Sequence, residues 1–489
     1  MGCYTALTSS DFSLRGLIHS EFSAFTGYNG KIMKLAYTSK LGWPLLLALS
    51  FAPLLIWALF PYSFDQRFLR GGSLNYAMTM TAVGQALGLS GMAMFALNLV
   101  LSARLKWLES IFGGMNKIYI AHHILGGLAF ILLLLHPLFL VARYLQAEGG
   151  AIKAALVNYV WSPSCAANFS LLNPDCSTTY GVTGLALMIL FLVLTFFVKL
   201  PYQTWKLTHK FLGLAFFFAS LHVLTIPSDV TTVAYLKYYM FALVAAGFLA
   251  ILYRTVLGFI IVPRLEYVID EVKVVNETVS EVVMHPKNEK KCIRYVPGQF
   301  IFIGFPDVSG LGEVHPFSLS SQPDDLCISI GVKALGDFTR RLRELRPGMR
   351  AVVEGPFGRT SYVYYPRKSQ IWIAGGIGIT PFLGMARSLK SDDGYKVDLY
   401  YSVVDRSDAA FLDELGNLAA RNPNLRLVPW FSREKSFLTA EAIVKESGGV
   451  LGKEIFLCGP PPMMKALKAQ FGKWKVPVAN IHSEEFSLN

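Results

Sequence analysis

Two apolar stretches, each long enough to cross a bilayer and each carrying well-separated histidines, limit most strongly what this chain can fold into. The first, AHHILGGLAFILLLLHPLF, holds His122, His123 and His136. The second, THKFLGLAFFFASLHVLTIP, holds His209 and His222. Histidine within hydrocarbon is costly and usually faces the interior of a helix bundle or a functional site. Because imidazole is also an axial ligand of haem iron, the two stretches could hold two haems between them.

The spacing within each stretch bears on this idea. His122 and His136 are 14 residues apart, about 3.9 helical turns, so their rings share one face roughly 21 Å apart. His209 and His222 are 13 residues apart, about 140° on an ideal helix, so a local irregularity or different ring approaches must absorb the offset. The alternative is that all four are buried polar groups bonded to nearby carbonyls. His123 lies one position off the shared face. It is either an alternative ligand of the inner haem or a residue that faces the membrane surface.

Composition agrees with a membrane protein. Of the 489 residues, 53% are hydrophobic, which also leaves room for more than one domain. The net charge of +12 fits an excess of Lys and Arg on cytoplasmic loops, and no basic stripe with interleaved aromatics indicates a nucleic-acid partner. The six cysteines show no CxxC spacing, which argues against zinc or iron–sulfur sites.

Six apolar runs are candidate membrane spans, after a mixed N-terminal segment, residues 1–40. Lys and Arg flank the second and fourth connections, which places both termini in the cytoplasm and predicts an integral membrane protein embedded in lipid. Arg67 and Arg70, in the first outer connection, run against this bias, and solvent-facing positions are the simpler expectation for both. The predicted spans are Leu41–Phe60, Tyr76–Leu101, Ile118–Val141, Gly181–Val198, Trp205–Ile226 and Tyr238–Ile261.

This topology places the third connection outside and gives each histidine a depth. Cys165 and Cys176, with ten residues between them, lie in that connection, where an oxidising compartment permits a disulfide. His122 and His209 lie toward the cytoplasm, and His136 and His222 lie toward the outside. The natural ring pairings are therefore His122 with His209 and His136 with His222, and these four are the predicted haem ligands.

The sequence changes character after Pro263. Short alternating segments such as YVIDEVKVV predict an antiparallel β-barrel over residues 264–367. Apolar strands then alternate with helical runs, which predicts a parallel α/β sheet over residues 368–489. The expected architecture is thus a six-helix transmembrane bundle over residues 41–263, followed by two soluble domains.

The β-barrel carries motifs that fit a flavin site. In order they read PGQF, HPFSLSS and GVKALGDFTRRL. Ser318 offers a small hydroxyl on a strand that could face the edge of an isoalloxazine. Gly336, Asp337, Phe338 and Thr339 open a helix whose free N–H groups suit a pyrophosphate, and Arg340 and Arg341 reinforce that positive end. Each motif alone could be a tight turn or a helix cap, but their order favours flavin.

The α/β domain carries two strand-to-helix turns, AGGIGITP (374–381) and CGPPPMM (458–464). Glycines there let the backbone approach a phosphate-bearing ligand at the carboxyl edge of a parallel sheet. Ser432 and Arg433 follow the strand LRLVPWF and suit a 2′-phosphate, which favours NADPH over NADH. The alternative is that these residues form an ordinary solvated charge cluster. Phe486, near the end of the sequence, could stack on the flavin.

These motifs carry a family resemblance over about residues 41–489. The H-x-x-x-G pairs, His122–Gly126 and His209–Gly213, resemble the ferric-reductase-like transmembrane domain. HPFS, GDFT, GGIGITP and CGPPPM resemble the ferredoxin–NADP reductase module of NADPH oxidases, closest to a prokaryotic-type member without EF-hands. The resemblance implies sites for FAD, two b-type haems and NADPH. It implies that His315, Pro316, Phe317 and Ser318 border the flavin, and that Gly375, Gly376, Gly378, Thr380 and Pro381 border the nucleotide. It further implies that Cys458 and Gly459 flank the nicotinamide and that Phe486 covers the flavin until NADPH displaces it, which makes Phe486, Cys458 and Ser318 the candidate catalytic residues.

The sequence therefore predicts transmembrane electron transfer from cytoplasmic NADPH through FAD and two haems to an outer acceptor. Dioxygen giving superoxide is the first choice, and either Arg67 or Arg70 could assist if it folded over the outer haem. A ferric-chelate reductase with the same electron path is the alternative, and delivery to an external protein is the third. A transporter with a redox domain would need charged residues along several spans, whereas these carry mainly histidines. The sequence holds no EF-hand for calcium control and identifies no accessory subunit.

Overall fold

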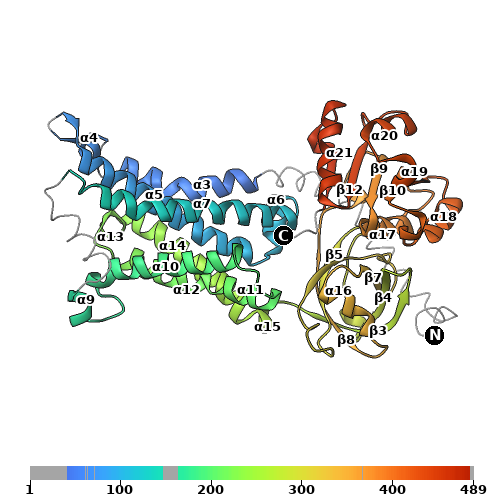
Figure 1. Ribbon diagram of the computed structural model, residues 1–489, viewed down its shortest axis with the longest axis horizontal. Coiled ribbons are helices and arrows are strands. Elements are labelled where there is room, and N and C mark those ends of the chain that lie inside the picture. Colours follow the sequence, from blue (N-terminus) through green and yellow to red (C-terminus); the bar gives the residue numbers. More distant parts are fainter. Residues whose placement is uncertain are drawn as a thin grey trace. The chain divides into compact units, whose positions relative to one another are not determined.

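The structure is a computed structural model that describes residues 41–60, 62, 64–70, 72–146, 163–365 and 367–484. The predicted N-terminal segment, 1–40, and Phe486 lie outside the described residues. The chain divides into two compact units, coloured along the sequence in Figure 1. One holds the described residues of 37–113 and 117–262, and the other holds Gly114–Asn116 and the described residues of 263–489.

The first unit contains, in the part of the chain described, six helical spans that are long and apolar enough to cross a membrane. This confirms the predicted six-helix bundle, with ends that differ from the sequence prediction by a few residues. The spans are α3 (Gly42–Leu59), α5 (Tyr76–Ser102), α7 (Met115–Ala142), α10 (Ser177–Phe196), the pair α11 (Tyr202–Lys210) and α12 (Leu212–Thr225), and α14 (Ala234–Ile251).

The outward faces of these helices are apolar. On α7, Ile120, Ile124, Leu128, Ile131 and Leu138 are 42–58% exposed and recur every three to seven residues along one side. An aqueous surface would penalise such a stripe, whereas lipid is as apolar as the side chains themselves. The stripe therefore marks the face of α7 that contacts hydrocarbon.

Helices α5 and α7 approach closely because α5 carries glycines at their interface. A Cβ atom built on Gly84 would lie 2.7 Å from the Leu140 side chain, and one on Gly91 would lie 2.8 Å from Leu133. Small residues of this kind let membrane helices pack backbone to backbone. The fifth span is interrupted at Phe211, whose N–H lies 3.3 Å from the Leu207 carbonyl and 3.1 Å from the Thr208 carbonyl. This tightened turn changes the helical phase between His209 and His222, which is one of the two explanations that their spacing left open.

The second unit begins with the predicted antiparallel β-barrel. Its six strands run in the order β6-β5-β8-β3-β4-β7. A bridge between Leu319 and Ile330 joins the two outer strands and curls the sheet around an apolar core that includes Tyr267, Ile301 and Val353. The strands are β3 (Leu265–Val274), β4 (Val279–Pro286), β5 (Phe300–Gly304), β6 (His315–Ser318), β7 (Ile328–Lys333) and β8 (Arg350–Phe357), with the short helix α16 (Asp337–Arg341) after β7.

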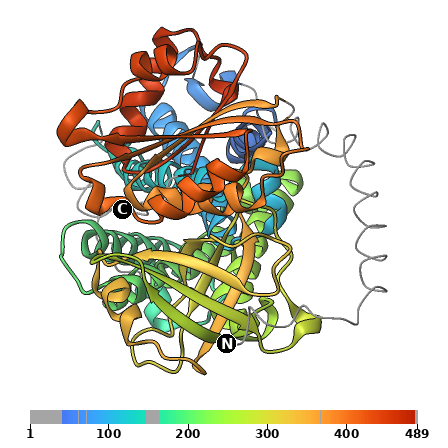
Figure 2. The same ribbon diagram turned by 90° about the vertical axis from the view of Figure 1, so that its right-hand side faces the viewer.

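A five-stranded parallel sheet follows, in the order β11-β10-β9-β12-β13. Alternate residues of its central strand serve opposite faces: Trp372 packs in the core that includes Phe382 and Leu415, and Ile371 packs in the core that includes Leu467. Figure 2 shows the sheet between helices on its two faces. The strands are β9 (Ser369–Gly375), β10 (Lys396–Val403), β11 (Leu425–Phe431), β12 (Glu454–Cys458) and β13 (Ile481–Ser483). The main helices are α17 (Thr380–Ser388), α18 (Leu412–Arg421), α20 (Ala440–Glu446) and α21 (Pro461–Lys473).

Candidate functional site

The helix bundle brings the four histidines together in the two pairs expected from their depths. The ring centres of His122 and His209 lie 6.2 Å apart, and those of His136 and His222 also lie 6.2 Å apart. With metal–nitrogen bonds of about 2 Å and about 1.2 Å from nitrogen to ring centre, two imidazoles on opposite sides of one metal ion have centres roughly 6.4 Å apart. Both pairs therefore have the spacing that an iron ion between them requires.

Hydrogen bonds fix the orientation of three of these rings. Nδ1 of His122 lies 3.1 Å from the Asn98 carbonyl, Nδ1 of His136 lies 2.7 Å from the Gly84 carbonyl, and Nδ1 of His222 lies 2.8 Å from the Ser177 carbonyl. A carbonyl can only accept, so Nδ1 carries the proton and Nε2 keeps its lone pair. That is the tautomer a metal-binding histidine needs, with the outer partner that usually accompanies it.

His209 is held differently. Its Nδ1 has no hydrogen-bond partner among the described residues. Instead its ring stacks on that of Trp205, with ring centres 5.6 Å apart and planes 9° apart. Packing thus takes the role that a carbonyl plays for the other three rings.

Glycines on neighbouring helices make room for the outer pair. A Cβ atom on Gly88 of α5 would lie 2.6 Å from Nδ1 of His136, and one on Gly181 of α10 would lie 2.9 Å from Nδ1 of His222. His123 is exposed, with its ring centre 5.9 Å from that of His122. The geometry favours His122 over His123 as the member of the inner pair.

The predicted flavin motifs meet at one end of the barrel. The ring centre of His315 lies 3.9 Å from that of Phe338, and Phe317 stacks on Phe338 at 6.4 Å. Ser318 is buried at the end of β6 opposite Phe300, and Pro316 lies opposite Phe302. Strand β6 and helix α16 therefore present their aromatic side chains together.

The start of α16 is partly occupied by its own side chain. The Thr339 hydroxyl accepts hydrogen bonds of 3.0 Å from the N–H groups of Leu335 and Gly336. Arg340 and Asp337 are exposed, while Arg341 binds Glu344 with 2.9 Å contacts and so does not add to the charge at this helix start. Fewer N–H groups are available to a pyrophosphate here than the sequence suggested.

The two glycine-containing turns of the α/β domain interlock at the carboxyl edge of the sheet. A Cβ on Gly378 would lie 2.3 Å from the Cys458 carbonyl, and one on Gly459 would lie 3.0 Å from Gly375. Gly376 has a φ of +55°, which favours glycine. Thr380 and Pro381 are buried in the first turn of α17 that follows. Only glycine permits this contact between backbones, so the turns form one surface at the position where α/β sheets bind nucleotides.

The buried Cys458 thiol is not a reactive group. It is 2% exposed, and burial raises the pKa of the Cys458 thiol above its usual value, with a smaller contribution from the charge of Glu484. A protonated thiol is a weak nucleophile. Cys458 can therefore border a ligand through shape, without covalent chemistry.

Asp405 and Arg433, only the second of which the motif analysis identified, form an ion pair at the same edge. With β9 as the first strand, the sheet has the order 3-2-1-4-5, and Asp405 follows the second strand, β10. Arg433 donates from Nη1 to the Asp405 carboxylate at 2.9 Å, and Ser432 precedes it. In nucleotide-binding sheets an acidic residue after the second strand accepts the ribose 2′-hydroxyl of NAD, and an arginine nearby accommodates the 2′-phosphate of NADP. The position of Asp405, just after the second strand, could have identified it from the sequence.

Arg387 on α17 connects the two soluble domains, and no sequence pattern identified it. It donates to Glu281 of β4 at 2.9 Å, to the Ser320 carbonyl at 2.8 Å and to Glu414 at 2.7 and 2.9 Å. A Cβ on Gly384, one turn earlier, would lie 2.6 Å from the Leu319 carbonyl. The helix that follows the nucleotide turn is thus held against strand β4 and against the end of the flavin motif HPFSLSS.

Arg67 corrects an expectation. It is not solvent-facing: it is 8% exposed, donates to Asp229 at 2.8 Å and to the Trp57 carbonyl at 2.6 Å, and lies 4.0 Å from the Trp57 ring. The partly buried carboxylate of Asp229 balances its charge, while Arg70 is exposed as expected. Arg67, Arg143 and Asp229 line a cavity of about 450 Å³ in the bundle.

Comparisons with known proteins agree with this division of the chain. Residues 87–220 match the family "Ferric reductase like transmembrane component", residues 265–361 match "FAD-binding domain", and residues 372–469 match "Oxidoreductase NAD-binding domain". NADPH oxidase 1 of Mus musculus is 29% identical over 251 residues, which cover 39% of this chain and 42% of that protein. The ferredoxin reductase component of the Mycobacterium tuberculosis 3-ketosteroid-9-alpha-monooxygenase is 29% identical over 209 residues, covering 41% and 57%.

The chain thus spans about half the length of the curated relatives it matches. Among solved structures, a ferredoxin NADP+ reductase from Neisseria gonorrhoeae with bound FAD and NADP covers 45% of this chain and 98% of its own. Its sequence is 19% identical and its TM-score is 0.39.

Proposed function

We propose that this chain, which joins a ferric reductase like transmembrane component to FAD-binding and NAD-binding domains, is a transmembrane oxidoreductase. It transfers electrons from cytoplasmic NADPH through FAD and two b-type haems to dioxygen on the outer side, giving superoxide. The observation that carries the proposal is the two histidine pairs, each with ring centres 6.2 Å apart, on the spans that cross the bundle. The lysines near the ends of α10 and α11, Lys199, Lys206 and Lys210, support the cytoplasmic assignment of that side.

The histidines would divide the crossing into two shorter steps. His122 and His209 would hold the inner haem, and His136 and His222 the outer one, roughly 21 Å apart along α7 for a hydrocarbon layer of about 30 Å. When bound, the haems supply the one-electron transfer chemistry. The protein contributes the tautomer of the ligands, their depth and the apolar surroundings that exclude water.

The soluble residues would bind and orient the two-electron donor. The strand with Ser318 and the aromatic pair His315 and Phe338 would border the flavin, and the interlocked turns with Gly378 and Cys458 would border the nucleotide. Phe486 would cover the flavin until NADPH displaces it. Arg387 would hold the two binding surfaces at a fixed separation. FAD and the nicotinamide supply hydride transfer, and the protein supplies their alignment.

The cavity with Arg67 and Arg143 supports the assignment of an acceptor region. Arg143 directly follows α7 and lies seven residues beyond His136 in the sequence, so it is near the outer end of the helix that carries His136. The guanidinium groups of Arg67 and Arg143 line this cavity together with the carboxylate of Asp229, and a guanidinium group there would stabilise superoxide. The same cavity favours the second candidate, a ferric-chelate reductase, since about 450 Å³ exceeds what dioxygen needs and an anionic chelate would suit the charge.

Visible spectra of the purified full-length protein test the proposal. NADPH added without air to protein supplied with FAD is expected to produce reduced b-type bands, and admitted air is expected to abolish them with superoxide trapped. Bands that persist in air but disappear with a ferric chelate would select the second candidate. Protein without any haem band would refute both.

Coenzyme preference is expected to depend on Asp405. In Asp405→Asn, Arg433 loses its competing carboxylate and the 2′-phosphate of NADPH loses a repelling charge. The ratio of kcat/KM for NADPH to that for NADH is therefore expected to rise about tenfold, equivalent to about 1.4 kcal/mol. Steady-state kinetics with both coenzymes measure this, with Asp413→Asn on α18 as the control for a lost exposed carboxylate. An unchanged ratio would mean that Asp405 does not face the 2′ position.

A further inference from the structure

We propose that the Cys165–Cys176 disulfide is a positioning element for the outer haem ligand His222. This inference rests on the proposed function, since it takes His222 as an iron ligand. The sequence permitted this disulfide without deciding whether it forms, and it is present. Its new role follows from what its second cysteine is attached to: Cys176 directly precedes Ser177, whose carbonyl accepts the hydrogen bond from Nδ1 of His222 at 2.8 Å.

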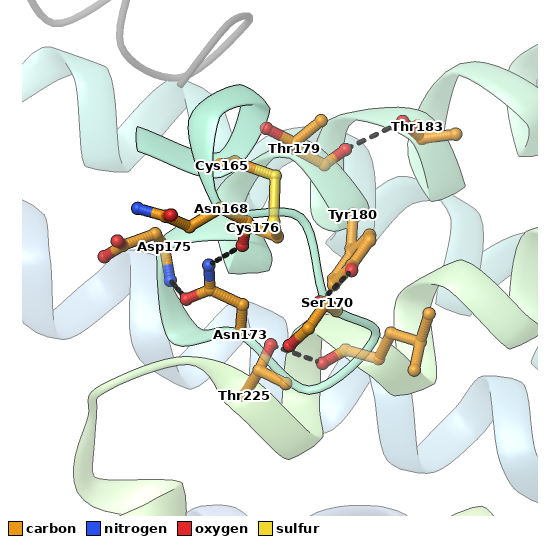
Figure 3. The surroundings of a disulfide bond; sticks show 11 residues. Cys165, Asn168, Ser170, Asn173, Asp175, Cys176, Thr179, Tyr180, Thr183 and Thr225 are labelled. Carbon is orange, nitrogen blue, oxygen red and sulfur yellow. Dashed lines mark hydrogen bonds between the residues drawn. A yellow bond between two sulfur atoms is a disulfide. The ribbon is translucent and has the colours of Figure 1, made fainter. Parts of the chain in front are cut away.

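The disulfide anchors the start of α10 from the loop side. Cys165 lies in α9 (Pro163–Ala167) and Cys176 ends the turn η2 (Pro174–Cys176), immediately before α10 begins. Both cysteines are buried, at 7% and 0% exposure. Asn173 accepts a 3.0 Å bond from the Asp175 N–H and donates a 2.7 Å bond to the Asn168 carbonyl, which keeps this loop closed (Figure 3). The backbone that carries the Ser177 carbonyl is therefore anchored by the loop that precedes α10.

A second contact joins the same loop to the helix that carries His222. Tyr180, one turn into α10, donates its hydroxyl to the Ser170 carbonyl inside the disulfide loop at 3.1 Å, as Figure 3 shows. Both cysteines and Tyr180 form one buried cluster with Leu221, the residue before His222. The disulfide cluster thus supports both partners of the bond between Ser177 and His222.

This support belongs to the outer pair alone among the residues described. The inner ring, His122, binds the carbonyl of Asn98, which lies inside the continuous helix α5. Asn98 has helical turns of α5 on both sides, whereas Ser177 is the first residue of α10, and the terminal turn of a helix frays most readily. A covalent link one residue before Ser177 compensates for that weakness. Without the link, the Ser177 carbonyl could move away, and His222 would lose the hydrogen bond that fixes its tautomer and orientation. Loss of such an outer hydrogen-bond partner typically lowers the affinity for the metal 10- to 100-fold.

Transfer of haem to excess apomyoglobin tests the proposal on the full-length protein. The double variant Cys165→Ser/Cys176→Ser is expected to release one of its two haems about tenfold faster than the unaltered protein, while the second haem leaves at the unaltered rate. The control Cys292→Ser removes an exposed free thiol and is expected to change neither rate. Equal acceleration of both haems, or of neither, would overturn the proposal.

Two further measurements keep this test decisive. If the double variant does not fold, reduction of the disulfide in the purified, haem-loaded protein provides the same comparison, and Tyr180→Phe removes only the bond to Ser170. Faster release of a single haem is expected in the first and a smaller effect in the same direction in the second. Unaltered protein that binds no haem would refute the proposed function itself, which separates that failure from the failure of the disulfide role.

Discussion

Replacement of His222 by alanine is expected to reduce the haem content from two per chain to about one and to reduce acceptor reduction to background. The loss removes one ring from the outer pair and leaves the Ser177 carbonyl without its donor. Leu221 and Gly181, which adjoin His222, carry no ligating group and so cannot supply the missing axial nitrogen. Pyridine haemochrome assays measure the haem content, and superoxide trapping measures the acceptor step.

The matched control is His123→Ala. His123 lies on the exposed side of α7, and its replacement is expected to leave both haems in place. Anaerobic reduction of FAD by NADPH is expected to remain within about twofold of normal in both variants, because it depends on the soluble domains. Haem loss in His123→Ala with retention in His122→Ala would mean that His123 is the inner ligand. Two haems retained in His222→Ala would contradict the ligand assignment.

Arg387→Met is expected to destabilise the soluble module by about 3 kcal/mol, because it leaves Glu281 buried without its counter-charge. Burial opposes ionisation of Glu281 most strongly. The charge of Arg387 and hydrogen bonds from Arg387, Ser329 and Ser320 outweigh it, so the pKa of Glu281 lies below its usual value. The change is also expected to slow hydride transfer to the flavin more than it raises KM for NADPH, since Arg387 touches neither ligand in the proposed arrangement. Thermal unfolding followed by FAD fluorescence and anaerobic stopped-flow reduction measure the two effects.

The pH dependence of this effect has a definite sign. Because the folded pKa of Glu281 is lowered, its contribution to stability is complete above its unfolded pKa, about 4.3, and is lost as the pH falls through the folded pKa. The difference in stability between the unaltered protein and Arg387→Met is therefore expected to be full at neutral pH and to shrink in acid. A difference that grew in acid would contradict the assignment of Glu281 as the charged partner.

Two controls separate burial from charge. Arg426→Met breaks a more exposed pair, with Asp398 at 2.7 Å, and is expected to cost less than about 1 kcal/mol. Arg387→Met combined with Glu281→Gln removes both charges and is expected to recover part of the loss. An Arg387→Met variant as stable as Arg426→Met would show that the contact between the domains does not depend on this pair.

The sequence by itself determined the features that depend on short-range pattern. Runs of about 20 apolar residues gave the six spans, because a helix must satisfy its own backbone hydrogen bonds in lipid. Apolar and polar residues that alternate with a period of two predicted the barrel. Strands that alternate with helices through glycine-containing turns predicted the parallel sheet. Helical spacing and depth together predicted which histidine rings would meet, and loop position made the disulfide plausible.

Only the tertiary structure decided which partner each polar side chain found. Arg67 looked like a solvent-facing loop residue, yet Asp229, 162 residues away, makes its burial possible. Arg387 and Glu281 are 106 residues apart, and nothing in the local pattern of either residue indicates the other. The carbonyls that orient His122, His136 and His222 come from other helices, and the turn at Phe211 that aligns the second stretch depends on packing around it. Local sequence encodes periodicity and turn preference, whereas the pairing of distant charges and hydrogen bonds is fixed only when packed elements bring them within reach.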